Sequence, residues 1–289
     1  MDNKKLERAI LDAALETHNP AGEKYRSLTL EKTRDLANSF SLSSRMVEQT
    51  ALEAGVIPER YQRSIGTVGI EGQICLLKAK VGIVGAGGLG GFALELLARM
   101  GIGRLVIIDD DTFSDSNLNR QLLAEESNLC ESKAEAARRR VAAINSSVEV
   151  TAHDARGNLA SMPLFFSGCD LILDCLDNLP SRFELEKVCD QLGVVMIHGA
   201  IAGFLGQIAV IRPDRPLLTS IYGPVVESGV RKGVEVHLGN PAATPAMLAA
   251  WQASEAVKYL AGLDGLLPAD KLLIIDMQAG ESYQVEVGA

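Results

Sequence analysis

A short apolar strand that runs into a glycine-rich loop and then a helix restricts the fold of this chain most. The apolar run is 80–84 (KVGIV), the loop is 85–90, and the helical run FALELLARM follows. Glycines allow a tight turn and close approach to a ligand, and the helix N-terminus attracts phosphate. Asp109, Asp110 and Asp111 come about twenty residues later, where nucleotide-binding folds place an acid on the ribose. The arrangement predicts a nucleotide site.

Strand and helix patterns alternate from about residue 79 onward. Strands are expected at 80–84, 105–108, 148–152, 171–175, 194–197, 207–211 and 272–275, and further helices at 133–144, 182–192 and 241–260. Apolar strands alternating with helices are typical of a parallel sheet covered on both faces. The predicted fold class is therefore α/β, with a Rossmann-like, mostly parallel sheet. The Gly-, Pro- and Ser-rich segment 213–241 is expected to be a functional or mobile loop.

Residues 1–55 differ from this pattern and are expected to form an N-terminal helical extension to a main domain at 56–289. Apolar residues recur at helical spacing near the start, and Pro20 and Gly22 then break the pattern. Segment 35–56 indicates two helices joined by a short turn. This fits a DNA-binding helix-turn-helix, or an extension packed on the main domain or a partner subunit. Residues 1–64 carry as many acidic as basic residues, which favours packing.

Charge and cysteine content narrow the class of protein. The chain has 289 residues and a formal net charge of −9, which disfavours nucleic acid and anionic membranes as partners. Its five cysteines form no CxxC pair, so we expect no disulfide framework and a cytoplasmic location. The longest uncharged stretch, 191–211, is interrupted by glycines and predicts two buried strands rather than a membrane span.

Polar residues beyond the aspartates change the predicted nucleotide. From the glycine loop alone, NAD is the first candidate. The polar residues that follow are Asn117, Arg120, Gln121, Lys133, Asp177 and Asn178. A reaction between a carboxylate and ATP needs fixed positive charge beside the triphosphate, which Arg120, Lys133 and Mg²⁺ would supply. Asp177, at the end of a predicted strand, could hold the Mg²⁺. Together these residues favour ATP.

In their order along the chain, these motifs resemble the ThiF/MoeB/HesA family, in the superfamily of ubiquitin-activating enzymes. The resemblance starts at about Glu59 and rests on ERYQRSIG, KVGIVGAGGLGG, IIDDDTFSDSNLNRQ, ESK, CLDN, HGAIAGFLGQIAV and WQASEAVKYLAG. It implies an adenylyltransferase that uses ATP and Mg²⁺ on the C-terminal glycine carboxylate of a ubiquitin-like sulfur carrier ending in Gly-Gly, of the ThiS or MoaD type. It also implies pyrophosphate release, a homodimer and a separate sulfur donor. Thiamine, molybdenum or tungsten cofactor, and cysteine pathways stay open.

The resemblance also implies roles for individual residues. Those expected to bind ATP are Gly85, Gly87, Gly88, Gly90, Asp109, Asp111, Asn117, Arg120, Gln121, Lys133 and Asn178. Those expected to act in catalysis are Arg63, Arg120, Lys133 and Asp177. Asp109 would bind the ribose, Asp177 would bind Mg²⁺, and Arg63 would reach the ATP of the partner subunit. By its sequence context alone, Arg63 is an ordinary surface arginine.

Two cysteine features of many relatives are missing. No CxxC pair follows 207–211 or lies near the C-terminus, so no zinc site is expected. No cysteine follows Cys189, and Glu235 stands near the place where some relatives carry a loop cysteine, so a thiolate nucleophile is not expected there. The residues expected to pack rather than react are Cys169, Cys175, Cys189, His198, Tyr222 and Trp251, and His198 has no partner visible in the sequence.

Three other functions stay open. The first is an NAD-dependent oxidoreductase. The second is a family relative that adenylates another carboxylate, such as that of a peptide, or a modified tRNA base, although the acidic balance weighs against tRNA. The third is a nucleotide-binding module without catalysis, whose N-terminal helices contact a partner.

Overall fold

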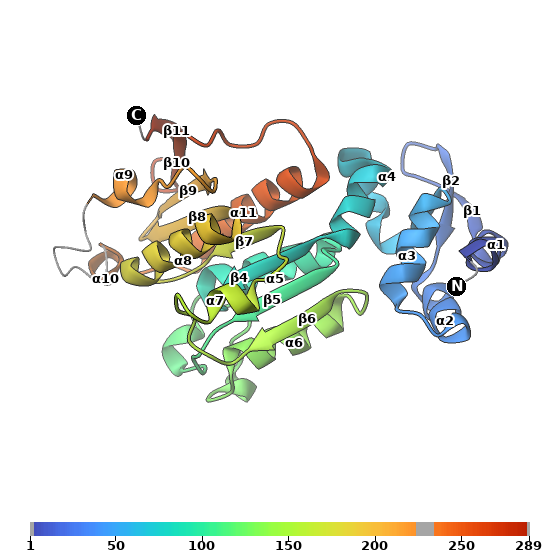
Figure 1. Cartoon of the computed structure of the whole chain (residues 1–289), viewed down its shortest axis with the longest axis horizontal. Helices are drawn as coiled ribbons and strands as arrows, with labels where there is room; N and C mark the ends of the chain where they lie inside the picture. The colour runs from blue at the N-terminus through green and yellow to red at the C-terminus, as the bar shows by residue number, and fades with distance from the viewer. Residues whose placement is uncertain (1–2, 224–233, 288–289) are drawn as a thin grey trace.

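The computed structural model describes residues 3–223 and 234–287, which form a small N-terminal unit beside a large α/β domain (Figure 1). The small unit consists of α1 (Asn3–Ala13), β1 (Leu15–His18), β2 (Lys24–Leu28), α2 (Leu30–Phe40), α3 (Ser44–Glu53) and β3 (Val56–Pro58). A short 3-10 turn (Glu59–Tyr61) and helix α4 (Gln62–Lys78) connect it to the large domain.

The large domain is built on one eight-stranded sheet with the order β11-β10-β9-β8-β7-β4-β5-β6. Its strands are β4 (Lys80–Val84), β5 (Arg104–Ile108), β6 (Glu149–His153), β7 (Leu171–Asp174), β8 (Val195–Ala202), β9 (Leu205–Ile211), β10 (Lys271–Asp276) and β11 (Glu281–Glu286). Strands β8, β7, β4, β5 and β6 are parallel. Strands β9, β10 and β11 extend this sheet in antiparallel pairs.

Helices cover both faces of this sheet and enclose two apolar cores. The helices on one face are α5 (Gly88–Met100), α6 (Lys133–Ile144) and α11 (Ala243–Ala261), and those on the other are α7 (Met162–Phe165), α8 (Leu179–Leu192) and α9 (Leu218–Tyr222). A further short helix, α10 (Glu235–Leu238), lies next to β8. The predicted fold class is confirmed, because parallel strands buried on both faces form the centre of the molecule.

The strands and helices predicted in the main domain are present, with ends shifted by a few residues. The uncharged stretch 191–211 contains the end of α8 and the expected pair of strands, β8 and β9, which pair antiparallel. Strand β11 was not predicted, since its six residues are all exposed and give no apolar pattern. Among residues 3–223 and 234–287, no helix is long and apolar enough to cross a membrane.

The N-terminal unit is not purely helical, which corrects the sequence prediction. Its expected helices are present, but β1, β2 and β3 form a three-stranded sheet with them. The hairpin between β1 and β2 turns at Asn19, whose side chain accepts hydrogen bonds from the backbone of Ala21 and Glu23. The two strands are short and largely polar, so they leave no strand pattern in the sequence, and Pro20 and Gly22 indicated only the end of the helix. Strand β3 also carries this sheet to Pro58, past the expected boundary at residue 55.

Helices α2 and α3 form the predicted pair of helices joined by a turn. Ser43 caps α3 by accepting a hydrogen bond from the backbone of Met46. In a DNA-binding motif the second helix would be presented to the groove. Here Val47 and Glu48 on α3 are buried, and α3 packs on α4. The structure therefore supports the packing interpretation of this unit.

Candidate functional site

A cleft of about 680 Å³ opens at the carboxyl ends of the parallel strands, where α/β sheets bind their ligands. The ends of β4, β5 and β7 line it, together with parts of β8, β9, α8 and α9. Among the described residues, the charged ones that line it are four acids, Asp109, Asp110, Asp111 and Asp177, and four bases, Arg120, Lys133, Arg156 and Arg182. These described residues are thus balanced in charge, whereas the whole chain is acidic.

The glycine loop forms one wall of the cleft. Gly85 has a positive φ of 94°, and a Cβ there would lie 2.7 Å from the Cys175 carbonyl oxygen. Gly87 caps α5, and Gly88 begins it, so the helix N-terminus faces the cleft. Gly90 does not line the cleft. A Cβ on Gly90 would lie 1.8 Å from the Gly85 carbonyl oxygen, so this glycine lets the helix pack on the loop.

Asp109 joins the end of β5 to the glycine loop. Its Oδ2 accepts a hydrogen bond from the Ala86 backbone at 2.6 Å, and its Oδ1 accepts one from the Asp111 backbone at 2.8 Å. Burial raises the pKa of Asp109, although these two hydrogen bonds and the charge of Lys133 act against it. Asp109 therefore holds the shape of the loop, and its carboxylate also lines the cleft.

Lys133 is a buried cation at the start of α6. Its Nζ lies 2.9 Å from Asp111 Oδ2, and only 7% of its side chain is exposed. The Lys133 backbone also donates to the Asp111 carbonyl oxygen at 3.0 Å. This double connection fixes the lysine in the cleft wall, as expected for a charge that acts on a ligand.

The turn after the aspartates presents Arg120 and Gln121 to the cleft. Arg120 Nη1 donates to the Ser116 carbonyl oxygen at 2.9 Å. Gln121 Oε1 is buried and has no hydrogen-bond partner among the described residues. Asn117 does not line the cleft; its Oδ1 accepts from the Ser114 backbone at 3.1 Å and so shapes the turn. A buried acceptor of this kind in a cleft wall is suited to a polar ligand that donates a hydrogen bond.

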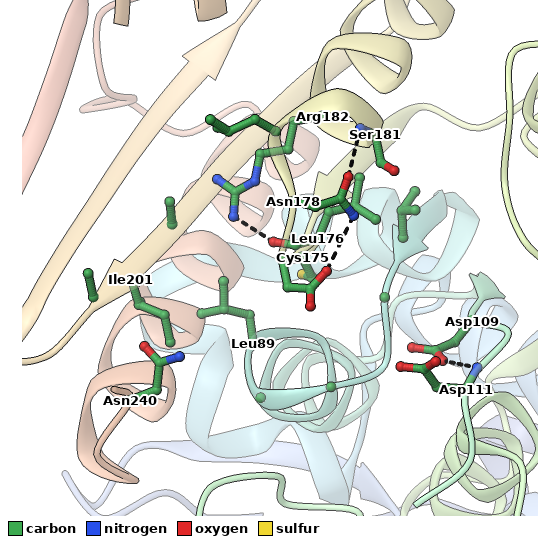
Figure 2. Close-up of a pocket in the computed structure, with 18 of the residues that line it drawn as sticks. Leu89, Asp109, Asp111, Cys175, Leu176, Asn178, Ser181, Arg182, Ile201 and Asn240 are labelled. Atoms are coloured by element: carbon green, nitrogen blue, oxygen red, sulfur yellow. Dashed lines mark hydrogen bonds between the residues drawn. The ribbon is translucent and has the colours of Figure 1, made fainter. Parts of the chain in front are cut away.

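Asp177 and Asn178 lie between the end of β7 and the start of α8, and both line the cleft. Asn178 caps α8, with its Oδ1 accepting from the Ser181 backbone at 3.0 Å, and its Nδ2 donates to Asp177 Oδ1 at 3.3 Å. A second helix N-terminus therefore faces the cleft. Figure 2 shows Asn178 and Ser181 at this end of α8, opposite Asp109 and Asp111.

Like Gly90 and Asn117, Arg63 does not line the cleft. It is exposed in the first turn of α4. Its neighbour Tyr61 is fully buried, where its hydroxyl donates to Glu48 and accepts from Asn145. Within a single chain, the motif that carries Arg63 thus anchors the N-terminal unit.

Five residues that sequence reasoning did not assign to the site form one hydrogen-bonded group: Asp174, Arg182, His198, Gln207 and Tyr222. Arg182, Gln207 and Tyr222 line the part of the cleft opposite Asp109 and Asp111, which we call its far half, and Asp174 and His198 are fully buried behind them (Figure 2). His198 does have partners, contrary to the impression from the sequence, and Tyr222 both packs and bonds. Asp174 lies in the predicted strand 171–175 and His198 directly follows the predicted strand 194–197, so that pair could have been found. Tyr222 follows an irregular segment, and no sequence pattern indicates where it folds back.

Three of the five cysteines are expected to pack, and they do so, while Cys75 and Cys130 are exposed. Cys169, Cys175 and Cys189 are buried, and burial raises the pKa of Cys169 to about 11. Burial also raises the pKa of Cys175 and of Cys189. Thiols of this kind are inert at neutral pH. Within residues 3–223 and 234–287, no group of three or more His, Cys, Asp or Glu side chains could hold a metal ion without help from a ligand.

Comparison with known proteins agrees with this geometry. Residues 61–288 match the ThiF family. The SAMP-activating enzyme E1 of Haloferax volcanii is 37% identical over 215 residues, which cover 72% of this chain and 79% of that protein. The sulfur carrier protein adenylyltransferase of Thermus thermophilus is 34% identical over 236 residues, which cover 76% and 84%.

Other similar proteins are longer or more distant. The chain spans about half (49%) of the adenylyltransferase and sulfurtransferase MOCS3 of Drosophila yakuba, at 36% identity. Among solved structures, Escherichia coli MccB with ATP superimposes with a TM-score of 0.68 at 20% identity, covering 88% of this chain and 79% of that one. At this identity, the likeness to MccB concerns the fold alone.

Proposed function

The chain belongs to the ThiF family, and we propose that it is an adenylyltransferase that uses ATP to activate the C-terminal carboxylate of a ubiquitin-like sulfur carrier. The relatives named SAMP-activating enzyme E1 and sulfur carrier protein adenylyltransferase support this substrate class. The observation that carries the proposal is the cleft itself. It combines a glycine loop with two helix N-termini and with the cations Arg120 and Lys133.

ATP fits the half of the cleft beside the glycine loop. The backbone at Gly87 and Gly88 opens the helix N-terminus to phosphate, while Arg120 and Lys133 offset the charge of the triphosphate. Asp109 would bind the ribose hydroxyls. Gln121 Oε1, buried without a partner among the described residues, needs a donor of the kind that ribose hydroxyls provide.

Magnesium fits the same site through Asp177. Mg²⁺ in nucleotide sites is usually held by one or two carboxylates together with phosphate oxygens and water. One carboxylate at the phosphate end of the cleft is therefore sufficient, and Asp177 lines the cleft there. When bound, the ion would offset charge on the phosphates.

The proposed reaction forms an acyl-adenylate. A carboxylate oxygen of the carrier attacks the α-phosphorus of ATP, and the bond from this phosphorus to the β-phosphate oxygen breaks. Pyrophosphate leaves with that electron pair. Negative charge grows on the leaving group, so Arg120 and Lys133 stabilise the transition state more than the ground state. A separate sulfur donor would then take the acyl group with release of AMP. No cysteine follows Cys189, and Cys175, the one cysteine among the described residues that line the cleft, is buried.

The carrier tail would enter through the other half of the cleft. Of the residues that the structure describes, those that line this half are uncharged apart from Arg182 and include Ala200, Gln207 and Asn240. The segment 213–241 is proposed to close over the tail, and its residues 224–233 lie outside the described part of the chain. A homodimer, in which Arg63 of one subunit serves the other, is part of the same proposal.

ATP–pyrophosphate exchange with a panel of carriers ending in Gly-Gly tests the function. We expect exchange with one carrier and not with the others. An Asp177→Asn variant should lose at least about a hundredfold in exchange rate, because the carboxylate proposed to hold magnesium is gone. Its thermal unfolding should match that of the wild type.

Three results would count against the proposal. No exchange with any carrier removes the carrier as substrate. Binding of NADH without binding of ATP would favour an oxidoreductase. Wild-type exchange by Asp177→Asn would remove Asp177 from the mechanism.

A further inference from the structure

A chain of hydrogen bonds connects the interior of the sheet to the far half of the cleft. Asp174 and His198 are directly paired between β7 and β8. His198 Nδ1 is 2.7 Å from Asp174 Oδ2, and His198 Nε2 is 2.9 Å from the Tyr222 hydroxyl oxygen. Arg182 Nη1 donates to the same hydroxyl oxygen at 3.2 Å, and Gln207 Nε2 also donates to it.

One arrangement of protons satisfies all these bonds. Ionised Asp174 accepts from His198 Nδ1–H, His198 Nε2 accepts from the Tyr222 hydroxyl, and the hydroxyl oxygen accepts from Arg182 and Gln207. Burial lowers the pKa of His198, so its ring is neutral at physiological pH. Burial by itself would raise the pKa of Asp174, but the charge of Arg182 and the hydrogen bond from His198 outweigh it and lower the pKa. The unit therefore contains one anion and one cation.

Tyr222 of this unit and the backbone at Leu176 hold the Arg182 guanidinium from two sides. Nη1 is bonded to Tyr222, and Nη2 donates to the Leu176 carbonyl oxygen. The residue is only 6% exposed, yet it lines the cleft. Figure 2 shows its guanidinium bonded to Leu176, on the side of the cleft where Ile201 and Asn240 lie.

Arg182 lies in a different part of the cleft from Arg120 and Lys133. Arg120 and Lys133 lie on the nucleotide side, and Asp109 and Asp111 are far from Arg182 in Figure 2. The described residues that line the far half from β8, β9, β10, β11 and α9 are all uncharged. Arg182 lies in the first turn of α8, so the helix N-terminus adds to its positive potential.

A carboxylate that enters such a half-cleft leaves water and needs a fixed cation. The planar fork of a guanidinium matches both carboxylate oxygens, provided that its plane is held. We propose that Arg182 receives the carboxylate of the second substrate, and that Asp174, His198 and Tyr222 are positioning residues that hold its guanidinium for that contact. This inference rests on the proposed function, which supplies a carboxylate substrate, and adds the group that binds it.

A pair of probes isolates this contact. One is a labelled short peptide that ends in Gly-Gly with a free carboxylate, and the other is the same peptide with a terminal amide. Their binding is measured by fluorescence anisotropy on the full chain with a non-hydrolysable ATP analogue and Mg²⁺. The wild type should bind the acid at least about tenfold more tightly than the amide, since the bond to Arg182 is charge-assisted.

Two variants should weaken that preference without unfolding the protein. Tyr222→Phe removes the hydroxyl that holds Arg182, and Arg182→Lys keeps the positive charge beside Asp174 but loses the fork. In both, the preference for the acid should fall below about threefold, while affinity for the ATP analogue stays at the wild-type value. Tyr259→Phe, which removes a hydroxyl outside the cleft on α11, is the matched control and should keep the full preference.

The outcomes separate this inference from the proposed function. Equal binding of acid and amide by the wild type, or no binding of either, overturns the inference. An unchanged preference in Tyr222→Phe also overturns it, as does an equal loss of affinity for the ATP analogue. If the wild type prefers the acid but forms no acyl-adenylate with any carrier, the proposed function fails while the role of Arg182 stands.

Discussion

Single glycines in the phosphate loop meet two different physical requirements. Gly90 lies where the first turn of α5 touches the loop, with no room for a Cβ beside the Gly85 carbonyl oxygen. Gly87 has a negative φ, and a Cβ there would meet nothing closer than Gln121 Nε2 at 3.6 Å. The protein around Gly87 therefore has room for a methyl group, which would project into the cleft where we propose that phosphate binds.

This difference predicts that substitution by alanine lowers stability at Gly90 and weakens ligand binding at Gly87. Gly90→Ala should lower the free energy of unfolding by about 2–4 kcal/mol, because backbone must move to admit the methyl group. Gly87→Ala should keep the wild-type stability and weaken ATP binding at least tenfold, because the methyl group blocks close approach of phosphate. Urea unfolding and ATP titration of both variants check this. Equal stability of the two variants would contradict the prediction.

At the scale of elements, a buried polar network joins α3 of the N-terminal unit to the large domain. Arg60 Nε lies 3.3 Å from Glu48 Oε1, and Tyr61 donates to Glu48 Oε2 at 3.0 Å. Asn145, which follows α6, donates to the Tyr61 hydroxyl and to the Ala98 carbonyl oxygen. Burial raises the pKa of Glu48 even though Arg60 and two hydrogen bonds act to lower it. Ionisation of Glu48 therefore costs more free energy in the folded chain than in the unfolded chain.

That cost predicts a pH dependence of stability. The folded chain binds the Glu48 proton more tightly than the unfolded chain, so the contribution of Glu48 falls as pH rises from the ordinary carboxyl range through its raised pKa. Glu48→Gln is neutral at every pH and lacks this loss. The stability of Glu48→Gln relative to wild type should therefore increase with pH, by at most about 1.4 kcal/mol per pH unit, and then level off.

Urea unfolding of both proteins from about pH 4 to about pH 8 measures this difference. Glu53→Gln, on the exposed side of the same helix, controls for the loss of one acidic side chain. A stability difference for Glu48→Gln that does not change with pH would show that Glu48 binds its proton equally in both states.

At the scale of the whole molecule, the cleft and Arg63 lie on different parts of the chain's surface. The cleft lies at the carboxyl edge of the sheet, while Arg63 is exposed on the helix that links the N-terminal unit to the sheet. The network around Tyr61 fixes the start of that helix. Arg63 can therefore serve an ATP site only if two chains come together.

A mixing experiment tests this arrangement. Arg63→Ala and Asp177→Asn should each be inactive as homodimers, since each removes a group from every site. Co-expressed in equal amounts, they should regain about a quarter of wild-type activity, because half of the dimers are mixed and each has one intact site. Mixtures with no more activity than the single variants would mean that Arg63 and Asp177 of one and the same chain serve one site, or that Arg63 serves none.

Much of the main domain follows from local pattern. Its predicted strands are apolar because they are buried on both faces, and the helices between them have one apolar side. The ends of parallel strands meet at one edge of a sheet, so the sequence could predict which residues gather there. These are the glycine loop, Asp109, Arg120, Lys133 and Asp177. Polar, exposed strands such as β1 and β11 could not be predicted, because their pairing leaves no apolar pattern in the sequence.

By itself, the sequence determined the α/β class, the position of the cleft and many of the residues that line it beside the glycine loop. Those features depend on short-range signals: strand, loop and helix in immediate succession. Only the tertiary structure decided that Gly90 and Asn117 shape the loop and the turn rather than line the cleft, and that Tyr222 returns to hold Arg182. Such roles depend on contacts between residues far apart in the chain, and these contacts exist only once the sheet and its helices have packed.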